Sequence, residues 1–140
     1  MKDVMITVKT VQISESDSEV LELTSEGRFG EKNGSYLITY KDSMMSDEYG
    51  VVNTAIKLGK DNSVTITRKG AYNSKFTVQE GKRCNSLYTT PFGTMSMGFY
   101  GEKVTGNLNE NGGTLELKYI VDINKSQASK NEIYITVREL

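Results

Sequence analysis

The sequence contains no histidine and only one cysteine, Cys84, in 140 residues. Histidine activates the nucleophile in Ser-His-Asp and Cys-His mechanisms, because its ordinary pKa lies near neutral pH. Its absence excludes both mechanisms, and it leaves a zinc ion with almost only carboxylates as ligands. We therefore expect no enzymatic activity, no metal site and no cofactor, and we interpret Cys84 as a buried structural thiol.

Long apolar segments are also missing. No stretch approaches the roughly 18 apolar residues that a membrane-spanning helix needs, and residues 1–10 lack the apolar segment of a signal peptide. A single cysteine cannot form a disulfide within the chain, which favours a reducing compartment. We expect a cytoplasmic protein without membrane contact.

The chain has no excess of positive charge, with 17 lysine and arginine residues against 18 aspartate and glutamate residues. Its basic residues form no run longer than a pair such as Lys82-Arg83. Proteins that bind nucleic acids usually carry a basic stripe, because neutralised phosphates supply much of the affinity. The composition therefore argues against a nucleic-acid partner.

Short runs of alternating apolar and polar residues fill the chain, each closed by a turn signal. The clearest run extends from Leu115 to Ile123, and alternation of this kind is typical of half-buried strands. Asn33-Gly34 and Asn111-Gly112-Gly113 are strong hairpin signals between such runs. The pattern predicts one all-β domain over residues 1–140, with nine to eleven antiparallel strands in mostly up-and-down order. A closed barrel covers the edges of such a sheet best, and a two-sheet sandwich is the alternative.

Two local features of the pattern predict irregularities. The strand from Val4 to Ile13 changes its apolar phase near Lys9 and Thr10, which predicts a bulge or a sharp bend there. After the strand with Met95, Met97 and Phe99 on one face, residues 104–108 are expected to form a separate short strand. The longest polar connection runs from Lys41 to Gly50.

Several segments resemble a known family over the whole chain and in the same order. They are Thr24-Ser25-Glu26-Gly27, Arg68-Lys69-Gly70, Glu80-Gly81-Lys82-Arg83, Ser86-Leu87-Tyr88-Thr89-Thr90-Pro91-Phe92-Gly93 and Gly112-Gly113-Thr114-Leu115-Glu116-Leu117-Lys118-Tyr119. The sequence resembles the DUF1934 family, YwiB-like bacterial proteins of unknown function, and the segment around Tyr88 is the most specific part. The resemblance implies a calycin-like β-barrel, related in architecture to lipocalins and fatty-acid-binding proteins. It implies no activity.

Arg68 is the most informative polar residue, because it is in phase with Val64 and Ile66 and is therefore expected to point inward. A buried guanidinium needs a partner. That partner is either a ligand carboxylate or phosphate, or an internal acid, unless Arg68 lies at the barrel rim. Tyr40, Tyr88 and Tyr119 lie on predicted strands, where tyrosine suits either a cavity wall or an ordinary core.

These residues lead to two functional hypotheses. The first is a non-enzymatic barrel that binds a small, anionic molecule inside, with Arg68, Arg83, Tyr40, Tyr88 and Tyr119 as candidate ligand-binding residues. The alternative is a protein- or RNA-interaction module with a filled core, which acts through outer residues such as Met44-Met45 and Tyr49 or Lys82-Arg83. The sequence leaves the oligomeric state open between monomer and dimer.

Overall fold

The computed structural model describes residues 1–42, 52–70, 74–90 and 93–140. Within these ranges, only the backbone is described for residues 42, 88–90 and 128. The described residues form an all-β structure with ten strands. The strands are β1 (Lys2–Ile13), β2 (Ser18–Lys32), β3 (Ser35–Asp42), β4 (Val52–Leu58), β5 (Val64–Gly70), β6 (Ser74–Val78), β7 (Arg83–Thr90), β8 (Gly93–Asn109), β9 (Gly112–Ile123) and β10 (Ser126–Glu139). Among the described residues, no helix could cross a membrane.

All ten strands belong to one antiparallel sheet in the order β6-β5-β4-β3-β2-β1-β10-β9-β8-β7. Each strand of this up-and-down sheet pairs with its sequence neighbours, except that β6 and β7 do not pair and that β1 also pairs with β10, from Val4↔Glu139 to Ile13↔Lys130. The sheet curls until its two outer strands, β6 and β7, approach each other. The result is a nearly closed barrel rather than two separate sheets, as the family resemblance implied.

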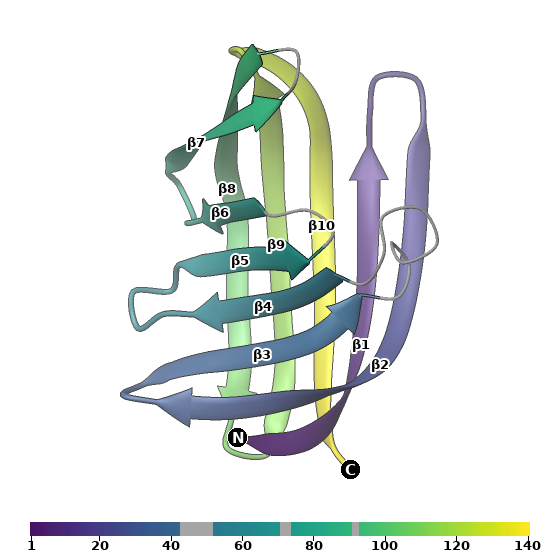
Figure 1. Cartoon of the computed structure of the whole chain (residues 1–140), viewed down its shortest axis with the longest axis vertical. Helices are drawn as coiled ribbons and strands as arrows, with labels where there is room; N and C mark the ends of the chain where they lie inside the picture. The colour runs from purple at the N-terminus through teal and green to yellow at the C-terminus, as the bar shows by residue number, and fades with distance from the viewer. Residues whose placement is uncertain (43–51, 71–73, 91–92) are drawn as a thin grey trace.

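The barrel is flattened into two layers (Figure 1). Strands β3–β6 form one layer and cross β8–β10 at a steep angle, while β1 and β2 curve from one layer to the other. Orthogonal packing of this kind relies on strands that bend around the corners. The long strand β2 therefore contributes to both layers.

The core follows the alternation that the sequence shows. Leu115, Leu117 and Val121 are at most 8% exposed and point inward from β9. A single row of paired positions crosses the other layer, and it consists of Phe29, Ile38, Ile56, Ile66 and Phe76. Burial of such a row removes large apolar areas from water and holds the two layers together.

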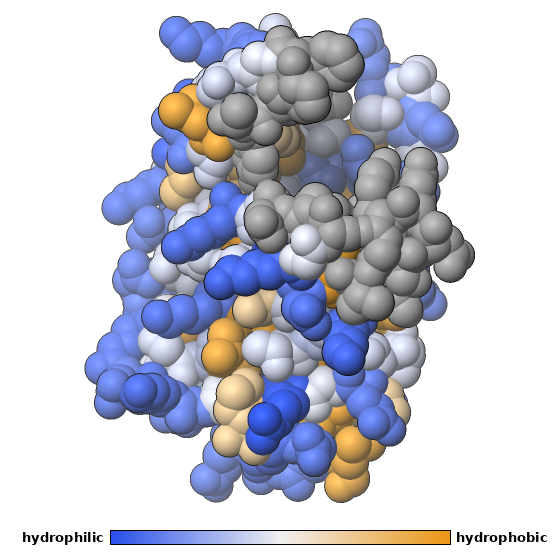
Figure 2. Space-filling model, viewed as in Figure 1, coloured by the Kyte–Doolittle hydropathy of each residue, from blue (hydrophilic) through white to orange (hydrophobic). Residues whose placement is uncertain are grey.

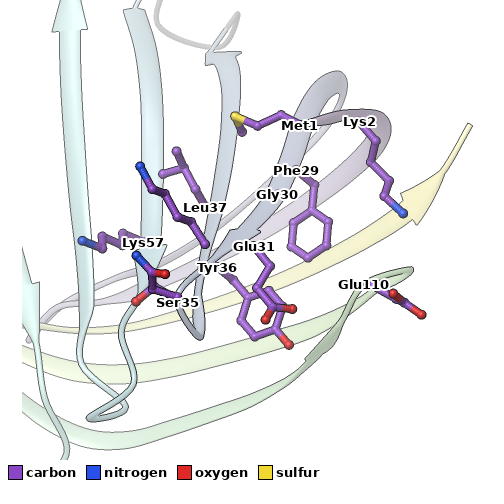
Figure 3. Close-up of a pocket in the computed structure, with 12 residues that line it drawn as sticks. Met1, Lys2, Phe29, Gly30, Glu31, Ser35, Tyr36, Leu37, Lys57 and Glu110 are labelled. Atoms are coloured by element: carbon purple, nitrogen blue, oxygen red, sulfur yellow. The ribbon is translucent and has the colours of Figure 1, made fainter.

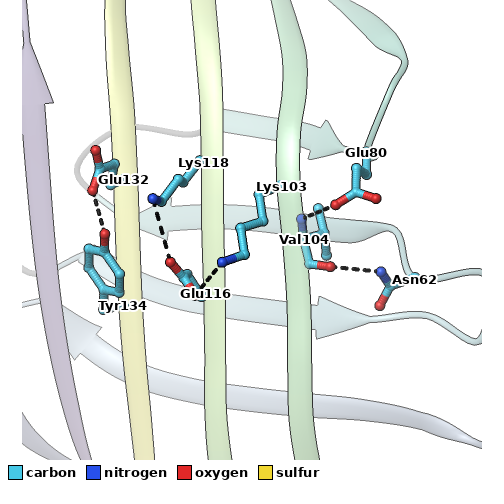
Figure 4. Close-up of polar contacts among 8 residues, drawn as sticks. All are labelled: Asn62, Glu80, Lys103, Val104, Glu116, Lys118, Glu132 and Tyr134. Atoms are coloured by element: carbon cyan, nitrogen blue, oxygen red, sulfur yellow. Dashed lines mark hydrogen bonds and ion pairs between the residues drawn. The ribbon is translucent and has the colours of Figure 1, made fainter.

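No continuous backbone ladder joins β6 to β8, and side chains complete the barrel there together with backbone hydrogen bonds between residues 81–82 and Gly101. The rings of Phe76 and Phe99 stack with centroids 4.4 Å apart. Glu80 accepts a hydrogen bond from the Val104 N–H at 3.1 Å, and Asn62 donates one to the Val104 carbonyl at 3.0 Å (Figure 4). These two contacts give hydrogen-bond partners to the Val104 N–H and carbonyl groups, on the side of β8 where no strand pairs with them.

The hairpin signals are confirmed, with one change in detail. Asn33 and Gly34 have φ values of 55° and 81°, as a two-residue turn between β2 and β3 requires. Gly112 and Gly113 instead begin β9, with φ values of 117° and 130°. The β8–β9 turn therefore lies at residues 110–111, one step earlier than the glycines suggested.

The predicted bulge in β1 and the predicted separate strand at residues 104–108 are both wrong. The pairing of β1 continues without a register shift through Lys9 and Thr10, so there is no bulge. β3 pairs with β2 only from Gly27 onward. The far end of the β1–β2 hairpin therefore extends beyond the core, where Ile13 is 39% exposed. This explains why the apolar residues of β1 change phase along the strand. Residues 104–108 are not a separate strand either, because β8 continues past a register shift between Gly101 and Lys103.

Candidate ligand-binding site

One row of paired positions on the inner face is polar. Tyr40 pairs with Thr54, Thr54 with Arg68, and Arg68 with Ser74, across β3–β6. This polar row lies next to the aliphatic and aromatic row that ends in Phe76. Two residues that the sequence singled out, Arg68 and Tyr40, therefore belong to one group, which is held in place by three ladders of backbone hydrogen bonds.

Arg68 is half-buried, and its guanidinium carbon lies 6.0 Å from the centre of the Phe76 ring. Within the described residues, no ion pair involves Arg68. A cation over an aromatic face gains some electrostatic stabilisation, but this does not replace a carboxylate in a desolvated position. The internal acid that the sequence allowed as a partner is not found among these residues.

Thr54 is the second unusual member of the row. It is 1% exposed, and its Oγ1 is the buried side-chain oxygen or nitrogen that has no hydrogen-bond partner among the described residues. A buried hydroxyl without a partner costs about 1–3 kcal/mol. An unsatisfied donor next to an arginine on the same inner face forms an arrangement that an anion would complete.

Aromatic rings border this polar row. Tyr119 is 6% exposed, and its ring centre lies 5.7 Å from that of Phe76 and 6.1 Å from that of Phe99. Asn131, which pairs with Tyr119 in the sheet, donates a hydrogen bond of 3.0 Å to Ser129 Oγ, and both side chains are buried. Tyr119 thus lies between an aromatic cluster and a second buried polar pair.

The structure does not bring Arg83 to this group, which corrects its prediction as an interior ligand residue. Arg83 lies on the outer face and donates to Asp122 at 3.0 and 2.5 Å. These hydrogen bonds hold the pKa of Asp122 below its usual range. The reason is register: Cys84 pairs with the buried Phe99, so Arg83 faces outward from the barrel.

The side chains of the other candidate residues are outside the described part of the structure. The backbone of Tyr88 pairs with Met95 in β7 and β8, but its side chain is not among those described. Met44, Met45 and Tyr49 belong to the segment 43–51 and are likewise outside the described residues. The predictions made for these four residues stay predictions.

Sequence reasoning missed Thr54, Phe76 and Asn131 as parts of the site. A signal existed for two of them. Thr54 occupies an inward position in the alternating run from Val52 to Leu58, and Asn131 is in phase with Ile133. A polar residue at an inward position of an alternating run indicates a buried polar side chain. An inward phenylalanine such as Phe76 gives no such indication, because it is an ordinary core residue.

A groove of about 840 Å³ lies near the N-terminus and the β2–β3 hairpin (Figure 3). Its aromatic part is formed by Phe29 and Tyr36, which stack with centroids 5.8 Å apart. Burial and the neighbouring Glu31 carboxylate raise the pKa of Tyr36. Charges of both signs line the groove, namely Lys2, Lys32, Lys57, Glu31 and Glu110. This mixture favours no ligand of one charge, and the polar row around Arg68 is the better candidate.

The architecture defines the class of the protein: an antiparallel ten-stranded barrel that is nearly closed. A family model described as "Domain of unknown function (DUF1934)" matches residues 6–135, so the chain belongs to that family. The crystal structure of the ywiB protein from Bacillus subtilis is similar, with a TM-score of 0.80 and 19% identity, over 99% of this chain and 92% of that chain. This similarity shows the fold. A comparison with curated proteins found no match.

Proposed function

We propose that this protein is a non-enzymatic barrel that binds a small anionic molecule at the polar row of its interior. The observation that supports the proposal is the pairing of Arg68, which has no carboxylate partner among the described residues, with the unsatisfied hydroxyl of Thr54. In this arrangement the guanidinium of Arg68 binds the anion, and Thr54 Oγ1 donates a hydrogen bond to it. The Phe76 and Tyr119 rings contact the apolar part of the ligand.

Thermal unfolding in the presence of phosphate, citrate and hexanoate tests the proposal, with native mass spectrometry of the purified protein as a second readout. A ligand at 100 times its Kd stabilises the folded state by about 2.7 kcal/mol. We expect at least one of these anions to raise the Tm of the wild-type protein, and Arg68→Gln to weaken its binding by about tenfold or more.

Arg83→Gln is the matched control, because it removes an arginine of the same charge from the outer face. We expect it to leave anion binding unchanged. Equal losses in the two variants, or no response of the wild-type protein to any of the anions, would contradict the proposal.

Thr54→Val gives an independent prediction about stability. Valine has nearly the shape of threonine and has no hydroxyl to satisfy, so we expect the ligand-free protein to become more stable by about 1 kcal/mol. The same change is expected to weaken anion binding several-fold. Urea denaturation and the thermal assay measure the two effects.

Thr65→Val is the control, because Thr65 Oγ1 lies 3.2 Å from Thr77 Oγ1 and has a hydrogen bond to lose. We expect it to lower stability by about 0.5–1 kcal/mol and to leave anion binding unchanged. A destabilised Thr54→Val protein would show that the hydroxyl of Thr54 is satisfied in solution.

A further inference from the structure

The outer face of one layer of the barrel is positively charged. Within the described side chains, the outward-facing positions of β3–β6 and of β2 from Arg28 to Lys32 include six cations and no carboxylate. We refer to these positions as the basic face, and its cations are Arg28, Lys32, Lys41, Lys57, Lys69 and Lys75. Because the whole chain has a net charge of −1, this face is a local concentration of positive charge.

The opposite outer face differs, because carboxylates lie beside cations on it. Glu116 lies 3.3 Å from Lys103 and 3.8 Å from Lys118 (Figure 4). Glu132 accepts a hydrogen bond from Tyr134, which raises the pKa of Tyr134 to about 12. On the basic face, Arg28 and Asp3 make a loose contact of 3.8 Å, and both side chains are more than half exposed.

A groove of about 620 Å³ crosses this face from β2 to β5. Its floor contains the small residues Thr39, Ala55 and Thr67, which pair with one another in the sheet. Three cations border it, Arg28, Lys41 and Lys69, and a single carboxylate, Glu26, lies at its β2 end. In the same view as Figure 1, hydrophilic and pale residues cover most of this face (Figure 2).

We infer that the groove on the basic face binds an extended acidic segment of a partner protein. Four strands spaced by about 4.8 Å give a groove length of about 14 Å, which accommodates four or five residues in extended conformation. Because the side chains on the floor of the groove are small, the backbone of such a segment can approach the sheet. The carboxylates of the segment then meet Arg28, Lys41 and Lys69. Charge complementarity of this kind gives specificity and speeds association.

The composition of the face favours a peptide over a nucleic acid. Among the described outward residues of the basic face there is no aromatic side chain. Single-stranded nucleic acids gain much of their affinity by stacking bases on aromatic rings. A duplex is too wide for the groove and would meet only the cations on its rim.

The test measures fluorescence anisotropy with a labelled peptide of alternating glutamate and alanine, at low and at physiological salt. We expect the wild-type protein to bind it with an affinity that falls as salt rises. The double variant Lys41→Glu/Lys69→Glu is expected to weaken binding by about tenfold or more. Ala55→Leu leaves the charge unchanged but fills the floor of the groove, so it is expected to weaken binding several-fold.

Two further variants separate the groove from a general charge effect. Glu26→Gln removes the carboxylate from the groove and is expected to strengthen binding about two- to threefold. Lys130→Glu/Arg138→Glu changes the net charge as much as the first double variant but lies on β10, on the opposite face. We expect it to leave peptide binding within about twofold of wild type.

This test is independent of the test of the interior anion site, because the Arg68→Gln variant is expected to bind the peptide with wild-type affinity. Absence of peptide binding, or equal losses in the two double variants, would overturn the inference. Tighter binding of a labelled oligouridine than of the acidic peptide would overturn it in favour of a nucleic-acid partner.

Discussion

Replacing Gly113 with alanine is expected to destabilise the barrel by at least about 3 kcal/mol, because both the backbone angle and the available space require glycine. Its φ is 130°, and a Cβ built there would lie 2.0 Å from the Asn107 carbonyl oxygen. That oxygen belongs to the backbone of the paired strand β8, so it can move only if the ladder opens. Urea denaturation, followed by circular dichroism, measures the loss.

Gly81 is the matched control for this prediction. It also has a positive φ, of 76°, but an added Cβ would meet nothing within 4 Å. Gly81→Ala therefore incurs only the conformational cost, about 1–2 kcal/mol. Similar losses for the two variants would show that the close approach of β8 and β9 at Gly113 is not maintained in solution.

Phe76→Ala is expected to lower the free energy of unfolding by about 3–5 kcal/mol, the usual range for a buried phenylalanine. Phe76 is 6% exposed and stacks on Phe99, so it joins β6 to β8 where the backbone ladder is interrupted. We also expect faster hydrogen exchange in β6 and β7 than in the central β1–β10 pair, because the contact lies at the edge of the sheet.

Two further substitutions serve as controls for Phe76→Ala. Phe76→Leu keeps most of the apolar volume and is expected to lose less, about 1–2 kcal/mol. Leu87→Ala removes a side chain that is 74% exposed and is expected to have almost no effect. If Phe76→Ala loosened all strands equally, the stacked rings would have no special role in holding the two edges together.

Local patterns predicted the fold well because the alternation of apolar and polar residues within each strand indicates which of its side chains are buried. The run from Leu115 to Ile123 and the Asn33-Gly34 turn needed no information from elsewhere in the chain. The errors arose where another part of the chain decides the outcome. Whether Val11 and Ile13 have a core to face depends on how far β3 extends along β2, which their own segment does not encode.

The site was only partly predictable for the same reason. Phase alone placed Arg68 on the inner face, but its grouping with Tyr40 depends on the register of two pairs of strands. Arg83 was assigned to the interior because nothing nearby in the sequence identifies its partner, Asp122, which is 39 residues away. Pairing over such distances is a property of the assembled sheet.

The ladder between β1 and β10 has a consequence for how the protein forms. Ten residue pairs join the two strands that are farthest apart in the sequence, and they lie in the middle of the sheet rather than at its margin. Contacts of high sequence separation slow folding, since a large loop must close before they form. During synthesis, one edge of β1 therefore stays open until β10 has left the ribosome, and the growing chain is most prone to aggregation in that interval.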